Sequence, residues 1–113
     1  MRLGHLELFC QDCATTQAFY VDVLDFEETE VQGGQFVWLR SDGIEVLLRP
    51  TSGFQAAPSY SKSRQAIVMY VDDLIEFQSS LEERGIPLGE PDGSPDCLTL
   101  QDPDGRWIQV VEH

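Results

Sequence analysis

The feature that most constrains the fold is an internal repeat: in a chain of 113 residues, the same series of strand-like and helix-like sequence patterns occurs twice. The segment 6–12, with the sequence LELFCQD, is matched by IVMYVDD at 67–73. Both segments alternate apolar residues with a period of two, which predicts strands, and both end in an acidic residue. The repeat therefore indicates two copies of one supersecondary unit that need each other to build a core.

A helical pattern follows each predicted strand. Asp12 and Asp73 stand where a helix N-cap is expected, since an Asp side chain accepts hydrogen bonds from the first free backbone amides. Apolar residues then recur at helical spacing, and the buried faces of the two predicted helices are Thr16, Phe19, Tyr20, Val23 and Leu24, and Leu74, Phe77 and Leu81. Gly85 is expected to end the second helix in the left-handed conformation.

The later part of each unit also repeats. The apolar residues Leu39, Val46 and Leu48 correspond to Leu100, Ile108 and Val110. Asp42-Gly43 and Asp104-Gly105 are typical of hairpin turns, in which the glycine is expected to take a positive φ. Each half therefore contains a strand, a helix, and then two or three antiparallel strands.

These patterns predict a single domain over residues 1–113. Its two modules are expected at about 1–50 and 65–113, joined by a linker at about 50–64 that is rich in Ser, Pro, Gly and Ala. Neither half is long enough to bury its own sheet.

Two motifs give the chain a family resemblance. The segment 19–26, FYVDVLDF, resembles the helix end F-Y-x-x-x-L-G-F, and 102–112, DPDGRWIQVVE, resembles the final hairpin D-P-D-G-x-x-I-E-L, of the vicinal-oxygen-chelate superfamily. This superfamily holds glyoxalase I, extradiol dioxygenases and bleomycin-resistance proteins. Asp25 replaces the family's usual glycine, at a small expected cost because Asp tolerates the left-handed region. The resemblance implies an α+β fold in which two βαβββ modules form curved mixed sheets around a cup.

In such a fold each helix covers one face of its sheet, and the period of two assigns every strand residue to a face. The residues expected under the helices are Leu6, Leu8, Val46, Leu48, Ile67, Met69, Val71, Ile108 and Val110. The predicted ligand-binding residues, facing the cup, are His5, Glu7, Glu45, Arg49, Tyr70, Trp107 and Gln109. A few polar groups above an apolar floor are typical of a small-molecule site. Trp107 and Tyr70 could instead fill a core, and the facing of Trp38 is ambiguous.

The polar residues of the predicted cup have candidate partners. Arg49 is expected to neutralise one of the two carboxylates, Glu7 or Glu45, and to leave the other for a cationic ligand. His5 is expected to bond Gln109 or Glu45, either of which would fix its tautomer.

The resemblance also implies four metal-ligand positions, which here are His5, Leu47, Ala66 and Gln109. Only His5 and Gln109 carry donors, and they are weak candidates because a catalytic divalent site needs at least three protein donors. No metal or other cofactor is therefore expected. The alternative is a shifted site of His5, Glu7 and Glu45, in which each Glu lies about 6–7 Å along its strand from a family position.

The three cysteines, Cys10, Cys13 and Cys97, make an odd count that fits a reducing compartment. Cys10 and Cys13 form a C-x-x-C pair that could serve a redox or metal site, although no second pair completes a zinc site. The alternation of the first strand favours burial of Cys10 in apolar packing instead.

The charge of the chain limits which partners are expected, and its apolar segments indicate the compartment. Seven Lys and Arg against twenty Asp and Glu give a net charge of −13, which repels nucleic acid and anionic membranes and suits a cationic ligand. No apolar run approaches the roughly 20 residues that span a bilayer. The N-terminal residues lack the apolar stretch of a signal peptide, so a cytoplasmic protein is expected.

Two functions follow. One is a metal-independent binding protein that resembles bleomycin-resistance proteins and acts as a homodimer that sequesters a small, cationic ligand in the cup, with Glu7 and Glu45 over Trp107 and Tyr70. The alternative is a lyase or isomerase of the glyoxalase type, with His5 or Glu7 as general base in a depleted or shifted site and Arg49 orienting a substrate carboxylate. A third possibility is a subunit whose cup binds nothing important. The sequence does not identify the ligand.

Overall fold

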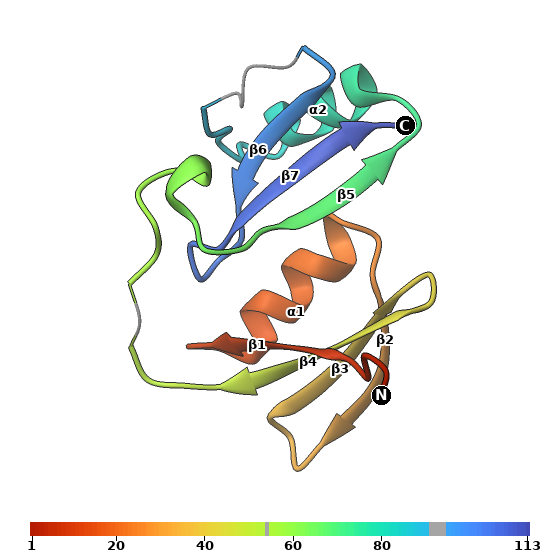
Figure 1. Ribbon diagram of the computed structural model, residues 1–113, viewed down its shortest axis with the longest axis vertical. Helices are drawn as coiled ribbons and strands as arrows, with labels where there is room; N and C mark the ends of the chain where they lie inside the picture. Colours follow the sequence, from red (N-terminus) through yellow and green to blue (C-terminus); the bar gives the residue numbers. More distant parts are fainter. Residues whose placement is uncertain (54, 91–94) are drawn as a thin grey trace. The chain divides into compact units, whose positions relative to one another are not determined.

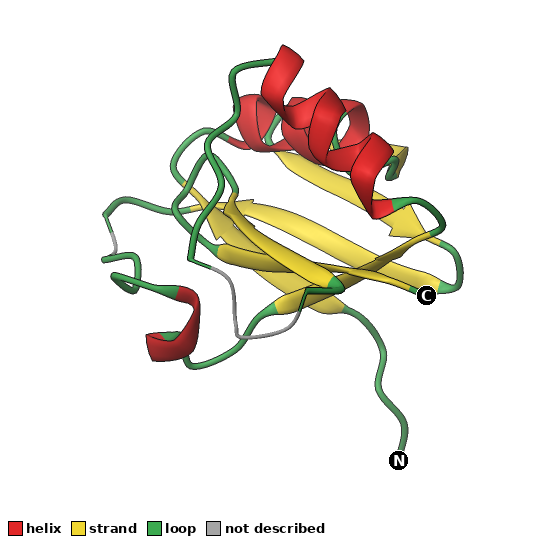
Figure 2. Ribbon diagram, turned by 90° about the horizontal axis from the view of Figure 1, so that it is seen from above, coloured by secondary structure: helices red, strands yellow, loops and turns green. Residues whose placement is uncertain are grey.

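The computed structural model describes residues 1–53, 55–90 and 95–113, and the chain forms two compact units, Met1–Phe54 and Gln55–His113. The first unit contains β1 (Leu6–Cys10), α1 (Cys13–Asp22), β2 (Glu27–Gln32), β3 (Phe36–Ser41) and β4 (Ile44–Pro50). Its strands form one sheet in the order β1-β4-β3-β2, in which β1 runs parallel to β4 and the other neighbours are antiparallel (Figure 1). The segment before β1 is a loop that extends away from the strands (Figure 2).

Helix α1 begins and packs as its sequence predicts. The Asp12 side chain accepts hydrogen bonds from the backbone N–H of Ala14 and Thr15, at 3.0 and 3.4 Å, which confirms Asp12 as the N-cap. The helix packs on β3 and β4, where the apolar side chains of one sheet face form the core of this unit. Its buried residues include Thr16 and Tyr20. Leu24 follows them in the core, whereas Phe19 and Val23 stay partly exposed.

The second unit repeats the topology of the first. It contains η1 (Tyr60–Lys62), β5 (Ile67–Val71), α2 (Leu74–Glu83), β6 (Cys97–Gln101) and β7 (Trp107–Glu112). Its sheet has the order β5-β7-β6, in which β5 is parallel to β7, as β1 is to β4, and β6 is antiparallel to β7, as β3 is to β4. The internal repeat of the sequence is therefore a repeat of structure.

The second module differs from the βαβββ pattern after its helix, where the described residues form two strands. Residues 86–90 carry no strand, and only one backbone hydrogen bond is recorded between them and β6, from Gly89 N to Thr99 O at 2.8 Å. Pro87 lacks a backbone N–H and so weakens any strand there.

Helix α2 is capped from two directions. Asp73 accepts from Glu76 N at 3.0 Å, as predicted for an N-cap, and the Glu112 carboxylate at the end of β7 accepts from Leu74 N at 3.1 Å. Gly85 ends the helix with a φ of 70°, which confirms the predicted left-handed stop. In neither unit, within the ranges the structure describes, is a helix long and apolar enough to cross a membrane.

Three turns show which residues take the left-handed conformation. Asp25 has a φ of 60° and Gly105 a φ of 81°, as expected. In the two-residue turn between β3 and β4, however, the left-handed residue is Asp42, with a φ of 54°, and the prediction that Gly43 holds this position is wrong. Asp accepts the conformation because its short polar side chain can bond locally.

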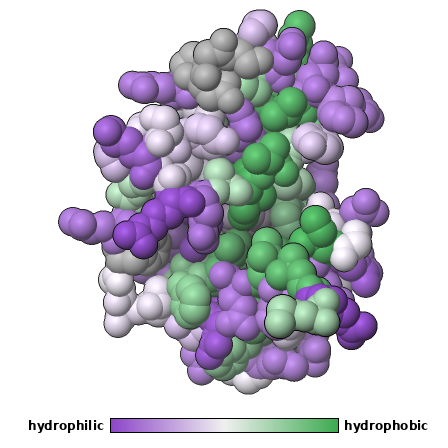
Figure 3. All heavy atoms as spheres, in the orientation of Figure 1, coloured by the Kyte–Doolittle hydropathy of each residue, from purple (hydrophilic) through white to green (hydrophobic). Residues whose placement is uncertain are grey.

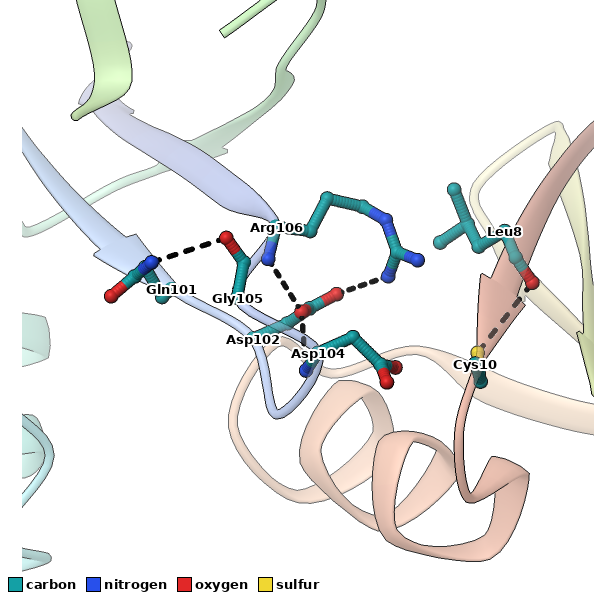
Figure 4. A network of polar contacts seen from close by, with 7 residues as sticks. All are labelled: Leu8, Cys10, Gln101, Asp102, Asp104, Gly105 and Arg106. Carbon is teal, nitrogen blue, oxygen red and sulfur yellow. Dashed lines mark hydrogen bonds and ion pairs between the residues drawn. The ribbon is translucent and has the colours of Figure 1, made fainter. Parts of the chain in front are cut away.

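The turn between β6 and β7 is organised by one buried carboxylate. Asp102 accepts hydrogen bonds from the backbone N–H of Asp104 and of Arg106, both at 2.9 Å, and pairs with the Arg106 guanidinium (Figure 4). The Asp102 side chain is fully buried, so the first Asp of the D-P-D-G motif has a structural role here.

Candidate functional site

The candidate site lies on the face of the first sheet opposite α1, which we call the helix-free face. In the strand register Glu7 is paired with Leu47 and Leu47 with Trp38, while Phe9 is paired with Arg49. Cross-strand partners share a face. The opposite face carries Leu8, Val37, Leu39, Val46 and Leu48, which are buried under α1. The alternation that was predicted for β1 and β4 is thus observed, although Leu6 is 41% exposed because β1 is an edge strand.

Three polar side chains form a connected cluster on the helix-free face. One Glu7 carboxylate oxygen, Oε2, lies 2.8 Å from His5 Nε2, and the other, Oε1, accepts from Arg49 Nη1 at 3.0 Å. The side chains of His5, Glu7 and Arg49 are 33%, 32% and 44% exposed. The hydrogen bond from Arg49, followed by that from His5, holds the pKa of Glu7 below its usual value. Glu7 is therefore an anion at neutral pH with a partner on each oxygen.

Three aromatic residues surround this cluster and form what we call the aromatic platform: Phe9, Phe36 and Trp38. The Arg49 guanidinium carbon lies 6.0 Å from the ring centre of Phe9 and 5.7 Å from that of Phe36. These distances allow cation–π attraction. The His5 ring contacts Trp38 edge to face at 4.7 Å. Phe9 is 50% exposed, and Figure 3 shows that hydrophobic residues reach the molecular surface among hydrophilic ones.

Sequence reasoning missed two members of the platform. The predicted site does not include Phe36, and the strand alternation alone does not fix the facing of Trp38. The signal lay in the two-residue turn at Asp42 and Gly43, which pairs Ser41 with Ile44 and therefore places Trp38 opposite Leu47. Counting back from that turn fixes the facing of all of β3.

The predicted partners of the polar residues need correction. His5 contacts Glu7, two residues further along the chain, and not Glu45. Arg49 neutralises Glu7, which was one of its two predicted partners. Glu45 is exposed and stands opposite Arg40, whose guanidinium pairs with Glu27 at 3.1 Å. Residues two apart on a strand share a face and lie close, so the local partner prevailed.

The predicted site residues of the second unit share the face opposite to Ile108 and Val110, and all three have partners within that unit. Trp107 is 8% exposed, and its indole N–H donates to Ala57 O at 2.8 Å. Gln109 accepts from the Tyr60 hydroxyl at 3.2 Å and donates to Cys97 Sγ at 3.4 Å. Tyr70 is 67% exposed and stacks on His113 at 4.4 Å. Trp107 and Gln109 are thus held by the predicted linker.

The residues at the family's metal positions do not fit a divalent ion. Leu47 and Ala66 have no donor atoms, and Gln109 already uses its carbonyl oxygen with Tyr60. No group of three or more His, Cys, Asp or Glu side chains that could hold a metal occurs within residues 1–53, 55–90 and 95–113. In the shifted alternative, both Glu7 oxygens are engaged by His5 and Arg49.

Both cysteines of the C-x-x-C pair are buried in the core of the first unit. Cys10 and Cys13 are buried thiols outside any disulfide, and Cys10 Sγ contacts Leu8 O at 3.5 Å (Figure 4). Cys97 is likewise a buried thiol outside any disulfide. Reactive thiols need an accessible environment that stabilises the thiolate, so burial is the role that the structure supports for this pair.

Comparison with known proteins places this geometry in context. A family model described as Glyoxalase/Bleomycin resistance protein/Dioxygenase superfamily matches residues 2–110. The chain resembles the structure of lactoylglutathione lyase from Agrobacterium tumefaciens, at 22% identity and a TM-score of 0.73 over 98% of this chain and 92% of the other. It also resembles the fosfomycin resistance protein FosX from Listeria monocytogenes, at 14% identity and a TM-score of 0.79 over 100% and 93%.

A third similar structure is a possible glyoxalase from Bacillus cereus, at 18% identity and a TM-score of 0.80 over 98% of both chains. At these identities the likeness shows the fold and not the activity. No curated protein matches the chain.

Proposed function

We propose that this chain, which belongs to the Glyoxalase/Bleomycin resistance protein/Dioxygenase superfamily, is a small-molecule-binding protein that works without a metal. The observation that carries the proposal is the helix-free face of the first sheet. There the cluster of His5, Glu7 and Arg49 adjoins the aromatic platform, and both reach solvent. A few polar groups fixed beside apolar rings are what a small-molecule site requires.

The fixed position of the polar groups supports binding in particular. Glu7 holds His5 on one side and Arg49 on the other, so none of the three side chains has to be ordered anew when a ligand arrives. Each immobilised side chain would otherwise cost about 0.5–1.5 kcal/mol of affinity. We propose sequestration, the mode of action of the bleomycin-resistance proteins that the chain resembles.

Metal independence is supported by the donor set. His5 is the one good ligand type among the four family positions, and its Nε2 atom is already bonded to Glu7. A chelator should therefore leave the melting temperature unchanged, because a metal bound to the folded state would stabilise it by mass action. Stoichiometric zinc, nickel or iron that survives dialysis would contradict this part of the proposal.

The binding site is tested with Trp38→Ala. A thermal-shift panel of aromatic small molecules should give shifts for the wild-type protein that are lost in this variant, because the change removes the platform ring that contacts His5. Ile75→Ala is the matched control, since Ile75 is 78% exposed on α2 in the other unit. Equal shifts in all three proteins would place binding elsewhere.

One observation favours a second candidate, a lyase or isomerase of the glyoxalase type. The 2.8 Å contact between His5 and Glu7 is the geometry of a general base oriented by a carboxylate. In that case any ligand found in the panel should be converted on incubation, as followed by NMR, and His5→Gln should abolish the conversion while binding remains. An unchanged ligand leaves sequestration as the function.

A further inference from the structure

We propose that the ligand of the helix-free face is an organic oxyanion, a carboxylate joined to a planar apolar group, with its oxygens on Arg49. This inference rests on the proposed function and names the chemical class that the site takes. It differs from the cationic ligand that the acidic composition of the chain suggests.

The first step is the number of donors that Arg49 keeps for a ligand. A guanidinium has five N–H donors in a fixed plane, and the contact with Glu7 is made by Nη1 alone. The Arg49 side chain is 44% exposed, so part of this plane faces solvent. A carboxylate can approach that part with two parallel hydrogen bonds, the geometry in which Arg recognises oxyanions best.

The second step is an asymmetry between Arg49 and Glu7. Both oxygens of Glu7 already have partners, one the cationic Arg49 and the other His5. A cationic ligand at Glu7 would have to compete with a guanidinium 3.0 Å away, whereas an anionic ligand adds to donors that are still available. The acceptor side of the cluster is therefore satisfied within the protein and the donor side is not.

The third step is the placement of the guanidinium between two rings. Phe9 and Phe36 lie 6.0 and 5.7 Å from it, which restricts its rotamers before any ligand binds. An anion that bonds to Arg49 brings the rest of the ligand against the same rings, where a planar apolar group buries the most area. One residue thus sets both the charge and the shape of the ligand.

The net charge of −13 repels an anionic ligand at long range, but it does not prevent binding once the ligand contacts Arg49. At an ionic strength of about 0.15 M the screening length is about 8 Å, so distant carboxylates are largely screened. A hydrogen-bonded guanidinium lies well inside that length. Exposed carboxylates also lie on this face, at Glu45 on β4 and Glu30 on β2, and a cation could bind there instead.

The test uses three probes with one ring system: naphthoate, the neutral naphthylmethanol, and the cationic naphthylmethylammonium. Calorimetric titration of the whole chain should show that naphthoate binds about tenfold or more tightly than either of the others. Arg49→Gln should weaken naphthoate by about tenfold to a hundredfold and leave naphthylmethanol unchanged. Arg40→Gln is the matched control, because Arg40 is also exposed on this face but its guanidinium pairs with Glu27 and not with Glu7. This variant should bind naphthoate as the wild type does.

Arg49→Lys provides a second variant in case Arg49→Gln does not fold. It keeps the charge and loses the planar fork, so it should retain part of the preference for naphthoate. Tightest binding of naphthylmethylammonium, or equal loss in Arg40→Gln and Arg49→Gln, overturns the oxyanion inference and leaves the proposed binding function intact. If none of the probes binds, or if all bind Trp38→Ala as they bind the wild type, the inference falls together with the site on this face.

Discussion

Replacing Asp102 with Ala tests how the D-P-D-G turn holds the second module. The change removes the acceptor of two backbone N–H groups, those of Asp104 and Arg106, and leaves the Arg106 guanidinium without its carboxylate. The Asp102 side chain has no exposed surface and that of Arg106 is 17% exposed, so water replaces the lost partners poorly. Breaking a buried pair by removing one member costs about 3–5 kcal/mol. Because the three contacts share one carboxylate, we expect a loss of this size for the variant as a whole and not a sum.

Asp102→Asn separates the two effects. Its carbonyl oxygen can still accept from the backbone amides but carries no charge for Arg106, so the loss should be smaller than for Asp102→Ala. Urea unfolding at neutral pH measures both variants by linear extrapolation. The control Glu28→Ala changes an exposed acid of β2 and should stay within about 0.5 kcal/mol of wild type. If Asp102→Ala were as mild as this control, the turn would not depend on its carboxylate and the reasoning would be refuted.

Three further predictions concern a helix cap, a glycine beside Trp107 and the edges of the two sheets. Hydrogen bonds from Thr15 and Ala14 lower the pKa of Asp12, so its cap stabilises the fold above the unfolded pKa and is lost as the pH falls through the folded one. Asp12→Asn should therefore lose less stability than wild type between about pH 5 and about pH 2, as measured by urea unfolding. Gly89→Ala would put a Cβ 2.2 Å from the Trp107 ring, and should cost about 1–3 kcal/mol, whereas Gly4→Ala, with nothing within 4 Å, should cost little. Finally, β1 and β2 in one sheet and β5 and β6 in the other are edge strands, so we expect a homodimer of twice the 12.7 kDa chain mass; sedimentation as a concentration-independent monomer would contradict this.

The parts of the fold that the sequence predicted are those decided by neighbouring residues. The caps at Asp12 and Asp73 and the left-handed residues Asp25 and Gly85 follow from local backbone chemistry, and all are present. The order of elements followed from the repeat. The error at Asp42 has the same local origin, because both residues of a two-residue turn tolerate positive φ and composition alone does not rank them.

For the candidate site, the sequence predicted which face of the sheet each residue lies on, but it did not predict which side chains bond to each other. A period of two fixes which residues of β1 and β4 point away from α1, and these faces came out as expected. Which carboxylate meets Arg49 depends on the register between β1 and β4, in which Phe9 stands opposite Arg49 and Glu7 lies two pairs away on the same face. That register joins residues far apart in the chain, and no short pattern encodes it. For the same reason, the contact of Trp107 with Ala57 in the linker was not foreseeable.

The two modules share a topology, but the sheet faces opposite α1 and α2 differ in charge, and this difference bears on the ligand. The cluster residues of the first module correspond through the paired strands to Ala66, Val68 and Val111, none of which carries charge. The first face therefore holds an exposed guanidinium, to which we assign the proposed oxyanion, whereas the second exposes apolar surface, with Val68 47% exposed. Beside the aromatic platform, the charged pair is that of Arg49 and Glu7, so we expect recognition to come from one charged contact and the rings next to it. The ligand best suited to such a surface is one that is charged at one end and apolar along the rest of its length.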